Sequence, residues 1–130
     1  MPLAYARALI LDDVPENLEF LRSLLEPNGI SVEAVGTIDE AFARLARRKP
    51  DIIISDLHLG DARGEDFYAR VKAKAELRRV PFMFISSTMQ RDADRLAALS
   101  EGADRFIVRP IESARLLAEI VACLSLRVGP

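Results

Sequence analysis

The sequence predicts a doubly wound α/β domain, in which helices cover both faces of a parallel sheet. Two observations predict this fold. Short apolar runs of strand length alternate with segments whose apolar residues recur at helical spacing. Four of the five apolar runs are continuous, as in strands that are buried on both faces. Because each helix returns the chain to the same end of the sheet, this alternation requires parallel strands joined by crossover connections.

Five segments have the length and composition of strands. They are rich in Ile, Val, Leu and Phe, and they occupy residues 8–11, 30–35, 51–55, 82–86 and 105–108. The chain has 130 residues, of which 50% are hydrophobic, and this is the size and composition of one compact domain. We therefore expect a single domain over residues 1–130, with its core at about residues 6–127.

Five helices are expected between and after these strands. The first begins at Pro15, where a missing N–H costs nothing, and ends before "PNG" at residues 27–29. The second begins after Thr37, because "TIDE" at residues 37–40 is a capping box. The other three are expected at about residues 65–74, at about residues 92–100 before Gly102, and at about residues 112–127.

Charge and composition exclude several classes of function. The net charge of −2 gives no general attraction to nucleic acid or to an anionic membrane, so we expect neither as a direct partner. No run reaches the length of about 18 apolar residues that spans a bilayer, and no signal peptide is recognised, so we expect a cytoplasmic location. The single cysteine, Cys123, excludes an intramolecular disulfide and a CxxC metal site, and we expect it to be a buried apolar residue.

Polar side chains follow four of the predicted strands. In chain order they are Asp12 and Asp13, Asp56, Ser86 and Ser87, and Arg109. We expect them at one edge of the sheet, because doubly wound folds gather functional groups beyond the carboxyl ends of their strands. Three carboxylates at this edge repel one another unless a cation joins them. Ligands that are all oxygen favour Mg²⁺, or another hard divalent cation such as Mn²⁺, over zinc or copper.

This set of residues predicts phosphoryl transfer onto an aspartate. Beside a cation and a basic side chain, an exposed carboxylate can attack phosphorus and form an acyl phosphate. Arg109 and a serine hydroxyl would then stabilise the phosphoryl oxygens. The alternative for any single Asp at a strand end is a helix cap or a turn residue, and Asp13 could cap the first helix. Suitable residues at four strand ends favour the functional interpretation.

The same motifs resemble a known family. With "LILDD", "PDIIISDLHLG", "PFMFISS" and "GADRFIVRP", the chain resembles the receiver domain of two-component response regulators over nearly its whole length. The resemblance implies the flavodoxin-like receiver fold, with a five-stranded sheet of order 2-1-3-4-5. It also implies a phosphoprotein of a phosphorelay. A histidine kinase or phosphotransfer protein would donate the phosphoryl group, and an output domain or partner protein would respond.

The resemblance also implies the ligands of the metal and of the phosphoryl group. Asp56 would be the phosphoacceptor. Asp13, Asp56 and the backbone carbonyl of His58 would bind Mg²⁺ directly, and Asp12 would bind it through water. The amide of Ser87 would face the phosphate.

Three further residues would take part in the switch. Ser86 would be the hydroxyl that moves towards the phosphoryl group, and Phe106 would be the aromatic residue that changes rotamer with it. The Arg109–Pro110 peptide bond matches one that is cis in the family, although an X-Pro bond by itself favours trans by about 0.5 to 1 kcal/mol.

The chain departs from the family pattern at two places. Arg109 replaces a Lys, and its planar fork reaches further than a compact ammonium group. We expect phosphorylation to survive this exchange and its coupling to the switch to weaken. Leu59 and Gly60 stand where Met-Pro is usual, and we expect Gly60 to free the loop that Pro would stiffen. Gly64 matches a glycine of the family.

Three functions are compatible with these residues. The first is a phosphorylation-dependent switch whose output face is the fourth helix, fifth strand and fifth helix. Leu96, Leu99 and Phe106 could be partly exposed on that face and meet a partner or a second copy of the chain, and the alternative, which we favour, is that they pack in the core. The second is a degenerate receiver that acts as a phosphorylation-independent interaction module, with Arg109 as its mark. The acidic residues and Ser86 favour the first.

The third function is a stand-alone phosphatase with an aspartyl intermediate. It is disfavoured because His58 stands where enzymes of the haloacid-dehalogenase type have a second Asp, and because the chain has no room for a cap domain. We therefore do not expect a stand-alone enzyme. The domain would only assist its own phosphorylation and dephosphorylation.

Overall fold

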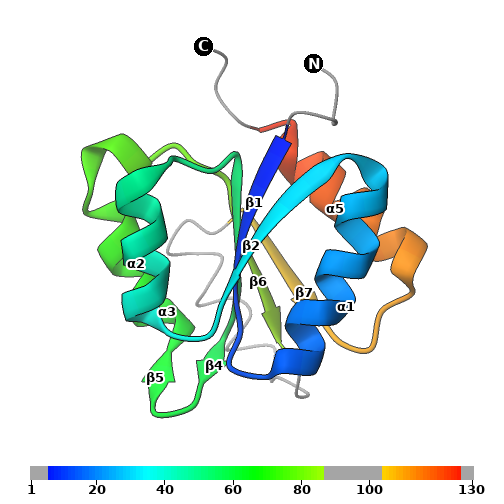
Figure 1. Ribbon diagram of the computed structural model, residues 1–130, viewed down its shortest axis with the longest axis horizontal. Coiled ribbons are helices and arrows are strands. Elements are labelled where there is room, and N and C mark those ends of the chain that lie inside the picture. Colours follow the sequence, from blue (N-terminus) through cyan, green and yellow to red (C-terminus); the bar gives the residue numbers. More distant parts are fainter. Residues whose placement is uncertain (1–5, 87–103, 127–130) are drawn as a thin grey trace.

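The computed structural model describes residues 6–86 and 104–126, and shows one parallel sheet between two layers of helices (Figure 1). The strands of this sheet are β1 (Ala6–Leu11), β2 (Ile30–Val35), β3 (Ile52–Asp56), β6 (Phe82–Ser86) and β7 (Arg105–Val108). Their order is β2-β1-β3-β6-β7, and every neighbouring pair is parallel. Because β6 and β7 are the fourth and fifth strands of this sheet along the chain, the expected order 2-1-3-4-5 is confirmed.

Four α-helices lie in the described part of the chain. They are α1 (Pro15–Leu25), α2 (Ile38–Arg47), α3 (Gly64–Lys72) and α5 (Ser113–Leu124), with short 3-10 turns η2 (Glu26–Asn28) and η3 (Ala75–Leu77). In Figure 1, α2 and α3 cover one face of the sheet and α1 and α5 the other. Two helices end slightly earlier than expected, α3 at Lys72 and α5 at Leu124. The helix expected at about residues 92–100 lies outside the described residues.

The start of α2 forms as its sequence predicts. The side chain of Thr37 accepts a hydrogen bond from the backbone N–H of Glu40 at 3.1 Å. The Thr37 hydroxyl also donates to the Glu40 carboxylate at 3.2 Å. This cap satisfies a backbone donor that has no partner within the helix, and it fixes the point where the chain turns from β2 into α2.

Two apolar clusters hold the sheet, one on each face. Alternate strand residues enter opposite clusters, so that Ile53 packs with α2 and α3 while Ile54 packs with α1 and α5. Cys123 belongs to the second cluster and is fully buried, as expected. Burial raises the pKa of the Cys123 thiol to about 12, so that the thiol stays protonated and acts as a packing group.

A small hairpin follows β3 and was not predicted. Strands β4 (His58–Leu59) and β5 (Ala62–Arg63) pair antiparallel across a two-residue turn. Gly60 is the first residue of that turn and has φ of 64°, a conformation that favours glycine. The glycine thus makes a turn that a Pro could not make, and the expectation that Gly60 frees this loop relative to Pro stays a prediction.

Gly64 allows α3 to begin directly against the end of β3. Its backbone N–H donates to the carbonyl oxygen of Leu57 at 2.8 Å. A Cβ at this position would overlap the carbonyl oxygen of Asp56, and it would lie 3.0 Å from both the Leu57 Cα and the Phe84 ring. The space beside Asp56 therefore admits a glycine and no larger residue.

We predict that Gly64→Ala destabilises the domain by about 1 to 3 kcal/mol, because the added methyl group meets backbone and core atoms that cannot move aside. Urea unfolding measures this change. Gly36→Ala is the matched control, since a Cβ there would meet its nearest neighbours at 3.7 and 3.9 Å, which are ordinary contact distances. Equal unfolding free energies for the two variants would contradict this account of Gly64.

Candidate functional site

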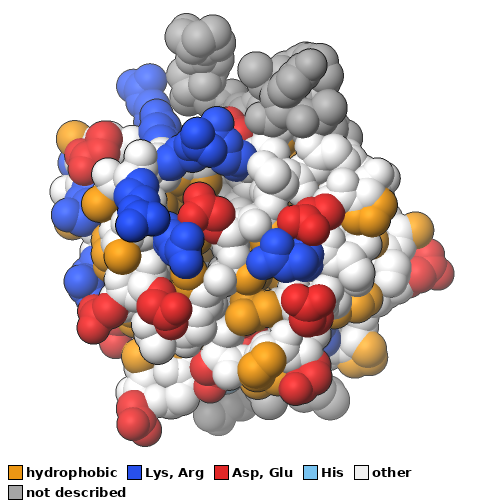
Figure 2. All heavy atoms as spheres, viewed as in Figure 1, with side chains coloured by type: hydrophobic (Ala, Val, Ile, Leu, Met, Phe, Trp, Pro, Cys, Tyr) orange, Lys and Arg blue, Asp and Glu red, His pale blue; other side chains and the backbone are white. Residues whose placement is uncertain are grey.

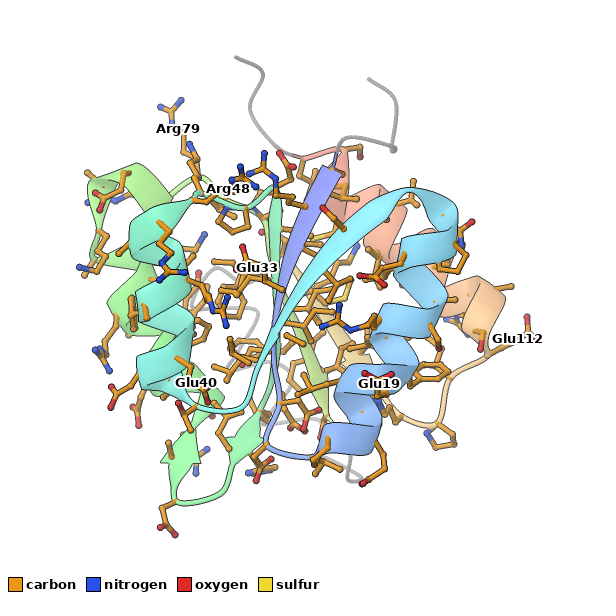
Figure 3. The ribbon with its side chains drawn as sticks, viewed as in Figure 1. Glu19, Glu33, Glu40, Arg48, Arg79 and Glu112 are labelled. Atoms are coloured by element: carbon orange, nitrogen blue, oxygen red, sulfur yellow. The ribbon has the colours of Figure 1, made fainter. Side chains whose placement is uncertain are left out.

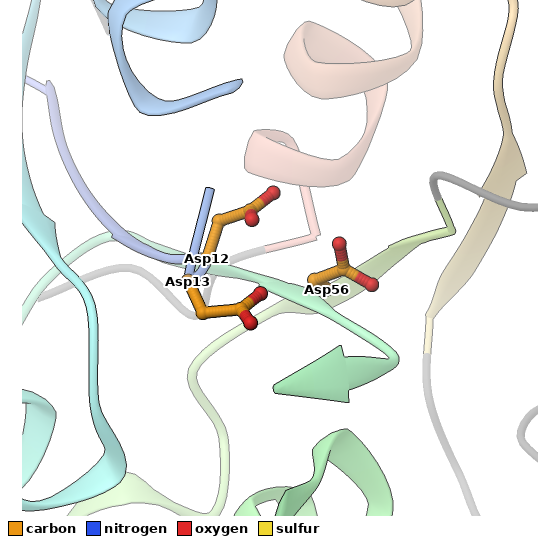
Figure 4. Close-up of side chains that lie close together, drawn as sticks. All are labelled: Asp12, Asp13 and Asp56. Carbon is orange, nitrogen blue, oxygen red and sulfur yellow. The ribbon is translucent and has the colours of Figure 1, made fainter. Parts of the chain in front are cut away.

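Three carboxylates meet where β1 and β3 end. Asp12 and Asp13 follow β1, and Asp56 is the last residue of β3. The two strands are neighbours, with Leu11 level with Ser55, so the residues after them reach the same edge of the sheet. One carboxylate oxygen from each Asp lies within 4.8 Å of the others (Figure 4). The grouping expected from the strand ends is present.

Two of the three carboxylates are buried. Asp12 is 2% exposed and Asp56 is 3% exposed, whereas Asp13 is exposed. Burial raises the pKa of Asp12, and the nearby charge of Asp56 raises it further. A hydrogen bond from the Val14 N–H at 2.8 Å, the polar side chain of Asn17 and the charge of Arg109 each lower the pKa of Asp12 in part. The charged form of this cluster therefore lacks compensating positive charge.

Asp13 does not cap the first helix, contrary to the alternative considered from the sequence. The N-cap residue of α1 is Val14, which has no side-chain cap. The carboxylate that accepts the Val14 N–H belongs to Asp12. Asp13 keeps its side chain beside the other two carboxylates.

Arg109 points its guanidinium into the carboxylate cluster. Its Nη1 lies 3.6 Å from Oδ2 of Asp12, and its side chain is 15% exposed. Among the described residues, neither Nη1 nor Nη2 has a hydrogen-bond partner. The Arg109 backbone N–H donates to the carbonyl oxygen of Ser86 at 3.0 Å, and the Arg109–Pro110 peptide bond is cis. This site therefore has two buried nitrogen atoms with free N–H donors, one of which lies beside the carboxylate of Asp12.

The backbone of His58 lies beside Asp56. Its N–H donates to Oδ1 of Asp56 at 2.9 Å, while the residue as a whole is exposed. The hydroxyl of Ser55 donates to the carbonyl oxygen of Asp56 at 2.9 Å. These contacts fix the orientation of the carboxylate and of the backbone that follows it.

Ser86 and Phe106 lie on the strands next to Asp56. Asp56 is level with Ile85 of β6, so Ser86 comes one residue further along that strand, where it is fully buried. Phe106 lies on β7 and is 7% exposed, with its ring centroid 6.3 Å from that of Phe84. Of the two alternatives for Phe106, core packing is therefore the one that the structure shows, because the ring packs inward against the core. Ser87, Leu96 and Leu99 lie outside the described residues.

The donor set fits a hard divalent cation. All three side chains offer oxygen, their oxygens lie within 4.8 Å of one another, and no sulfur or imidazole atom belongs to the group. The raised pKa of Asp12 shows that positive charge at this point would stabilise the ionised cluster.

One interaction within the site could not be found from strand ends alone. The side chain of Asn17, in the first turn of α1, lowers the pKa of Asp12. The only signal in the sequence is its place in the first turn after the paired Asp residues.

No helix within residues 6–86 and 104–126 is long and apolar enough to cross a membrane.

We predict that Asp12→Asn stabilises the metal-free domain at neutral pH. Because the pKa of Asp12 is higher in the folded than in the unfolded state, stability falls as pH rises from the unfolded pKa through the folded one. The amide introduced by Asp12→Asn carries no charge, so the variant does not lose this stability. The measurement is the free energy of unfolding in urea, with a chelator present, at pH 7 and at lower pH. At pH 7 the variant should be more stable than the wild type, and this difference should shrink as the pH is lowered. A variant less stable at pH 7 would contradict this, and exposed Asp61→Asn is the control.

Comparison with known proteins identifies the family. A model of the response regulator receiver domain matches residues 8–121. The phosphate regulon transcriptional regulatory protein PhoB of Rhizobium meliloti is 30% identical over 115 residues, which are 88% of this chain and 50% of that protein. The KDP operon transcriptional regulatory protein KdpE of Escherichia coli is 33% identical over 116 residues, 89% of this chain and 50% of that protein. The chain thus spans about half the length of these two relatives.

Solved structures agree with this match. The signal receiver domain of a signal transduction histidine kinase from Syntrophus aciditrophicus has a TM-score of 0.82 and 30% identity, and covers 92% of this chain and 90% of its own. The non-phosphorylated HemR receiver domain from Leptospira biflexa has a TM-score of 0.84 and 27% identity, and covers 96% and 98%. Given the family-model match over most of its length, the chain belongs to the receiver domains of two-component response regulators.

Proposed function

We propose that this receiver domain is an active phosphorylation switch, in which Asp56 accepts a phosphoryl group. Phosphorylation-dependent switching is the function of the family. The observation that carries the proposal for this chain is the grouping of buried Asp56 with Asp12, Asp13 and the guanidinium of Arg109, which forms an ion pair with Asp12 while its two terminal nitrogens have no hydrogen-bond partner among the described residues. We further propose that residues 1–130 form one receiver domain, with a core at about residues 6–127.

The cation of the proposed site is Mg²⁺, with Mn²⁺ as a substitute. Asp13, Asp56 and the backbone carbonyl of His58 would hold it directly, and Asp12 would hold it through water. The oxygen-only donor set and the His58 backbone fixed on Asp56 support this assignment. When bound, the cation offsets the negative charge of the carboxylates and of a phosphoryl group.

Residues of the chain provide the rest of the proposed chemistry. A carboxylate oxygen of Asp56 attacks phosphorus and forms the new P–O bond, while the bond from phosphorus to the donor breaks. The N–H groups of Arg109 and the hydroxyl of Ser86 stabilise the phosphoryl oxygens, and the amide of Ser87 faces them. The new charge then draws Ser86 towards it, and Phe106 changes its rotamer in response.

The proposed donor is a histidine kinase or a phosphotransfer protein, and the proposed output is a second domain or a partner protein. The output face would comprise the fourth helix, which lies outside the described residues, together with β7 and α5. Val108 of β7 supports this face, since it is an apolar residue that is 38% exposed. A second copy of the chain could dock on the same face. The domain assists its own phosphorylation and dephosphorylation and is not a stand-alone enzyme. Its cytoplasmic location stays a prediction.

One observation favours a second candidate function. Arg109 occupies the position of a family Lys, which is the change expected in a degenerate receiver that binds its partner without phosphorylation. The three grouped carboxylates and the buried Ser86 support the active switch instead.

Intact mass spectrometry separates the two candidates. After incubation with acetyl phosphate and Mg²⁺, we expect the chain to gain one phosphoryl group. Asp56→Asn should gain none, because the amide is not a nucleophile towards phosphorus. Removal of Mg²⁺ with a chelator should also prevent the gain. If the wild-type chain gains no mass and also fails to bind beryllofluoride, the degenerate receiver is correct.

We predict that Arg109→Ala slows phosphorylation by acetyl phosphate at least about tenfold, because the variant lacks the buried donors at the phosphoryl site. Arg109→Lys should keep a rate within several-fold of the wild type, since it retains a positive charge and a donor. Initial rates from intact mass measure both. Arg115→Ala, an exposed position on α5, is the control. An unchanged rate in Arg109→Ala would show that the guanidinium takes no part.

A further inference from the structure

We propose that the groove between α2 and α3 is a docking site for an acidic peptide segment of a partner protein, one that inserts an apolar side chain. The groove has a volume of about 240 Å³. Phe42, Leu45 and Leu77 form its apolar wall, and the exposed side chains of Arg70, Lys74 and Glu76 form its rim. It is separate from the carboxylate cluster and from the proposed output face, so the proposal goes beyond phosphorylation of Asp56.

Phe42 provides a fixed apolar anchor for such a segment. Its ring is half-buried and meets the ring of Phe67 edge-on, with centroids 5.5 Å apart and an interplanar angle of 71°. Phe67 is itself fully buried in the core. The position of the Phe42 ring is therefore set by the core, which leaves little conformational freedom to lose when a ligand binds.

Two cationic side chains, those of Arg70 and Lys74, lie against the ring of Phe42. The guanidinium carbon of Arg70 is 4.5 Å from the Phe42 centroid, and Nζ of Lys74 is 5.7 Å from it. Both contacts are favourable cation–π interactions, and they hold the two charges at the mouth of the groove. An apolar surface and positive charge thus occur within one short side-chain cluster.

These cations have no carboxylate partner in the described part of the chain. None of the ion pairs there uses Arg70 or Lys74. Arg47 and Arg48 at the end of α2 are also exposed and unpaired among those residues, but they do not line the groove. The rim itself carries two cations, Arg70 and Lys74, and the one carboxylate of Glu76, so its balance of charge is positive.

The pictures agree with this distribution of charge. Figure 2 shows Lys and Arg side chains gathered on the side of the molecule that α2 forms. Figure 3 places Arg48 and Arg79 at one end of that side. Complementary charge raises the association rate and selects among partners, so such a surface favours an acidic ligand.

The combination of features favours a peptide over other anions. A purely polyanionic ligand would leave the wall of Phe42, Leu45 and Leu77 without a partner, and the net charge of −2 opposes general binding to nucleic acid. A volume of about 240 Å³ accommodates an apolar side chain or two. A segment with Asp or Glu on either side of a Leu or Phe satisfies both the rim and the wall.

Selection from a random peptide library tests the proposal. Displayed peptides of about 12 residues are selected on the immobilised wild-type chain, and the enriched sequences are then labelled and measured by fluorescence anisotropy. We expect enriched peptides to carry acidic residues around one apolar residue. Their affinity should fall at least about tenfold in Arg70→Glu combined with Lys74→Glu, and it should weaken as salt is raised.

Matched variants keep the test specific to the groove. Phe42→Ala removes the apolar anchor and should also weaken peptide binding. If this variant fails to fold, the double reversal at Arg70 and Lys74 still tests the groove, because it changes only exposed side chains and leaves the core intact. Arg115→Glu reverses an exposed charge on α5 and should leave the affinity unchanged. The reversal variant should also be phosphorylated at the wild-type rate, so failure of the groove and failure of the Asp56 site are distinguishable.

Several results would overturn the proposal. They are the absence of enriched peptides, enrichment of basic or purely apolar sequences, or an affinity that the reversal at Arg70 and Lys74 does not change. Single-stranded oligonucleotides and vesicles containing phosphatidylserine serve as competing ligands. If either binds more tightly than the selected peptides and depends on Arg70 and Lys74, the occupant is a nucleic acid or a membrane, and the proposal of an acidic peptide is wrong.

Discussion

The parallel pairing of β1 with β3 is the constraint on which the site depends. It brings Asp12 and Asp56, two carboxylates that are almost completely buried, to the same edge of the sheet. Such an arrangement is unfavourable in isolation, and burial together with the charge of Asp56 raises the pKa of Asp12 accordingly. The Val14 N–H, Asn17 and Arg109 offset part of this cost. Apolar clusters on both faces of the sheet hold the strands in place, so the fold stabilises a cluster of charges that is unfavourable by itself.

Arg109 lies beside these buried carboxylates and is also the residue that we expect to bind the phosphoryl group. The two terminal nitrogens of the Arg109 guanidinium are buried and have no hydrogen-bond partner in the described part of the chain, which is costly because a buried donor without a partner loses the hydrogen bonds that it makes to water in the unfolded chain. Phosphoryl oxygens on Asp56 would satisfy them. Because a planar fork binds an oxyanion through two donors, the exchange of Lys for Arg changes how this chain would hold the phosphoryl group. The groove at Phe42 lies on another surface, so partner binding there does not compete with this chemistry.

The sequence was sufficient where a local pattern has one structural solution. The continuous run Ile52–Ile54 is a central strand because both of its faces are covered, and Thr37 caps α2 because its neighbours complete a capping box. It was insufficient where side chains compete for the same role. Asp13 was a candidate cap for α1, yet the N-cap residue is Val14, and the carboxylate that accepts the Val14 N–H belongs to Asp12. The hairpin at Gly60 was missed because two-residue strands carry almost no periodicity. Core packing and partial exposure of Phe106 both stayed open, because the choice between them depends on packing across the sheet, which a linear pattern does not contain.

The most direct test of this account is a crystal structure of the domain grown with Mg²⁺ and beryllofluoride, a mimic of the phosphoryl group. The account predicts beryllofluoride on the carboxylate of Asp56, a cation in contact with Asp13 and Asp56, and the guanidinium of Arg109 donating to the fluorides. A carboxylate cluster that holds neither ion at saturating concentrations of both would contradict it. In that case the buried charges of Asp12 and Asp56 would have to be explained without a phosphoryl group.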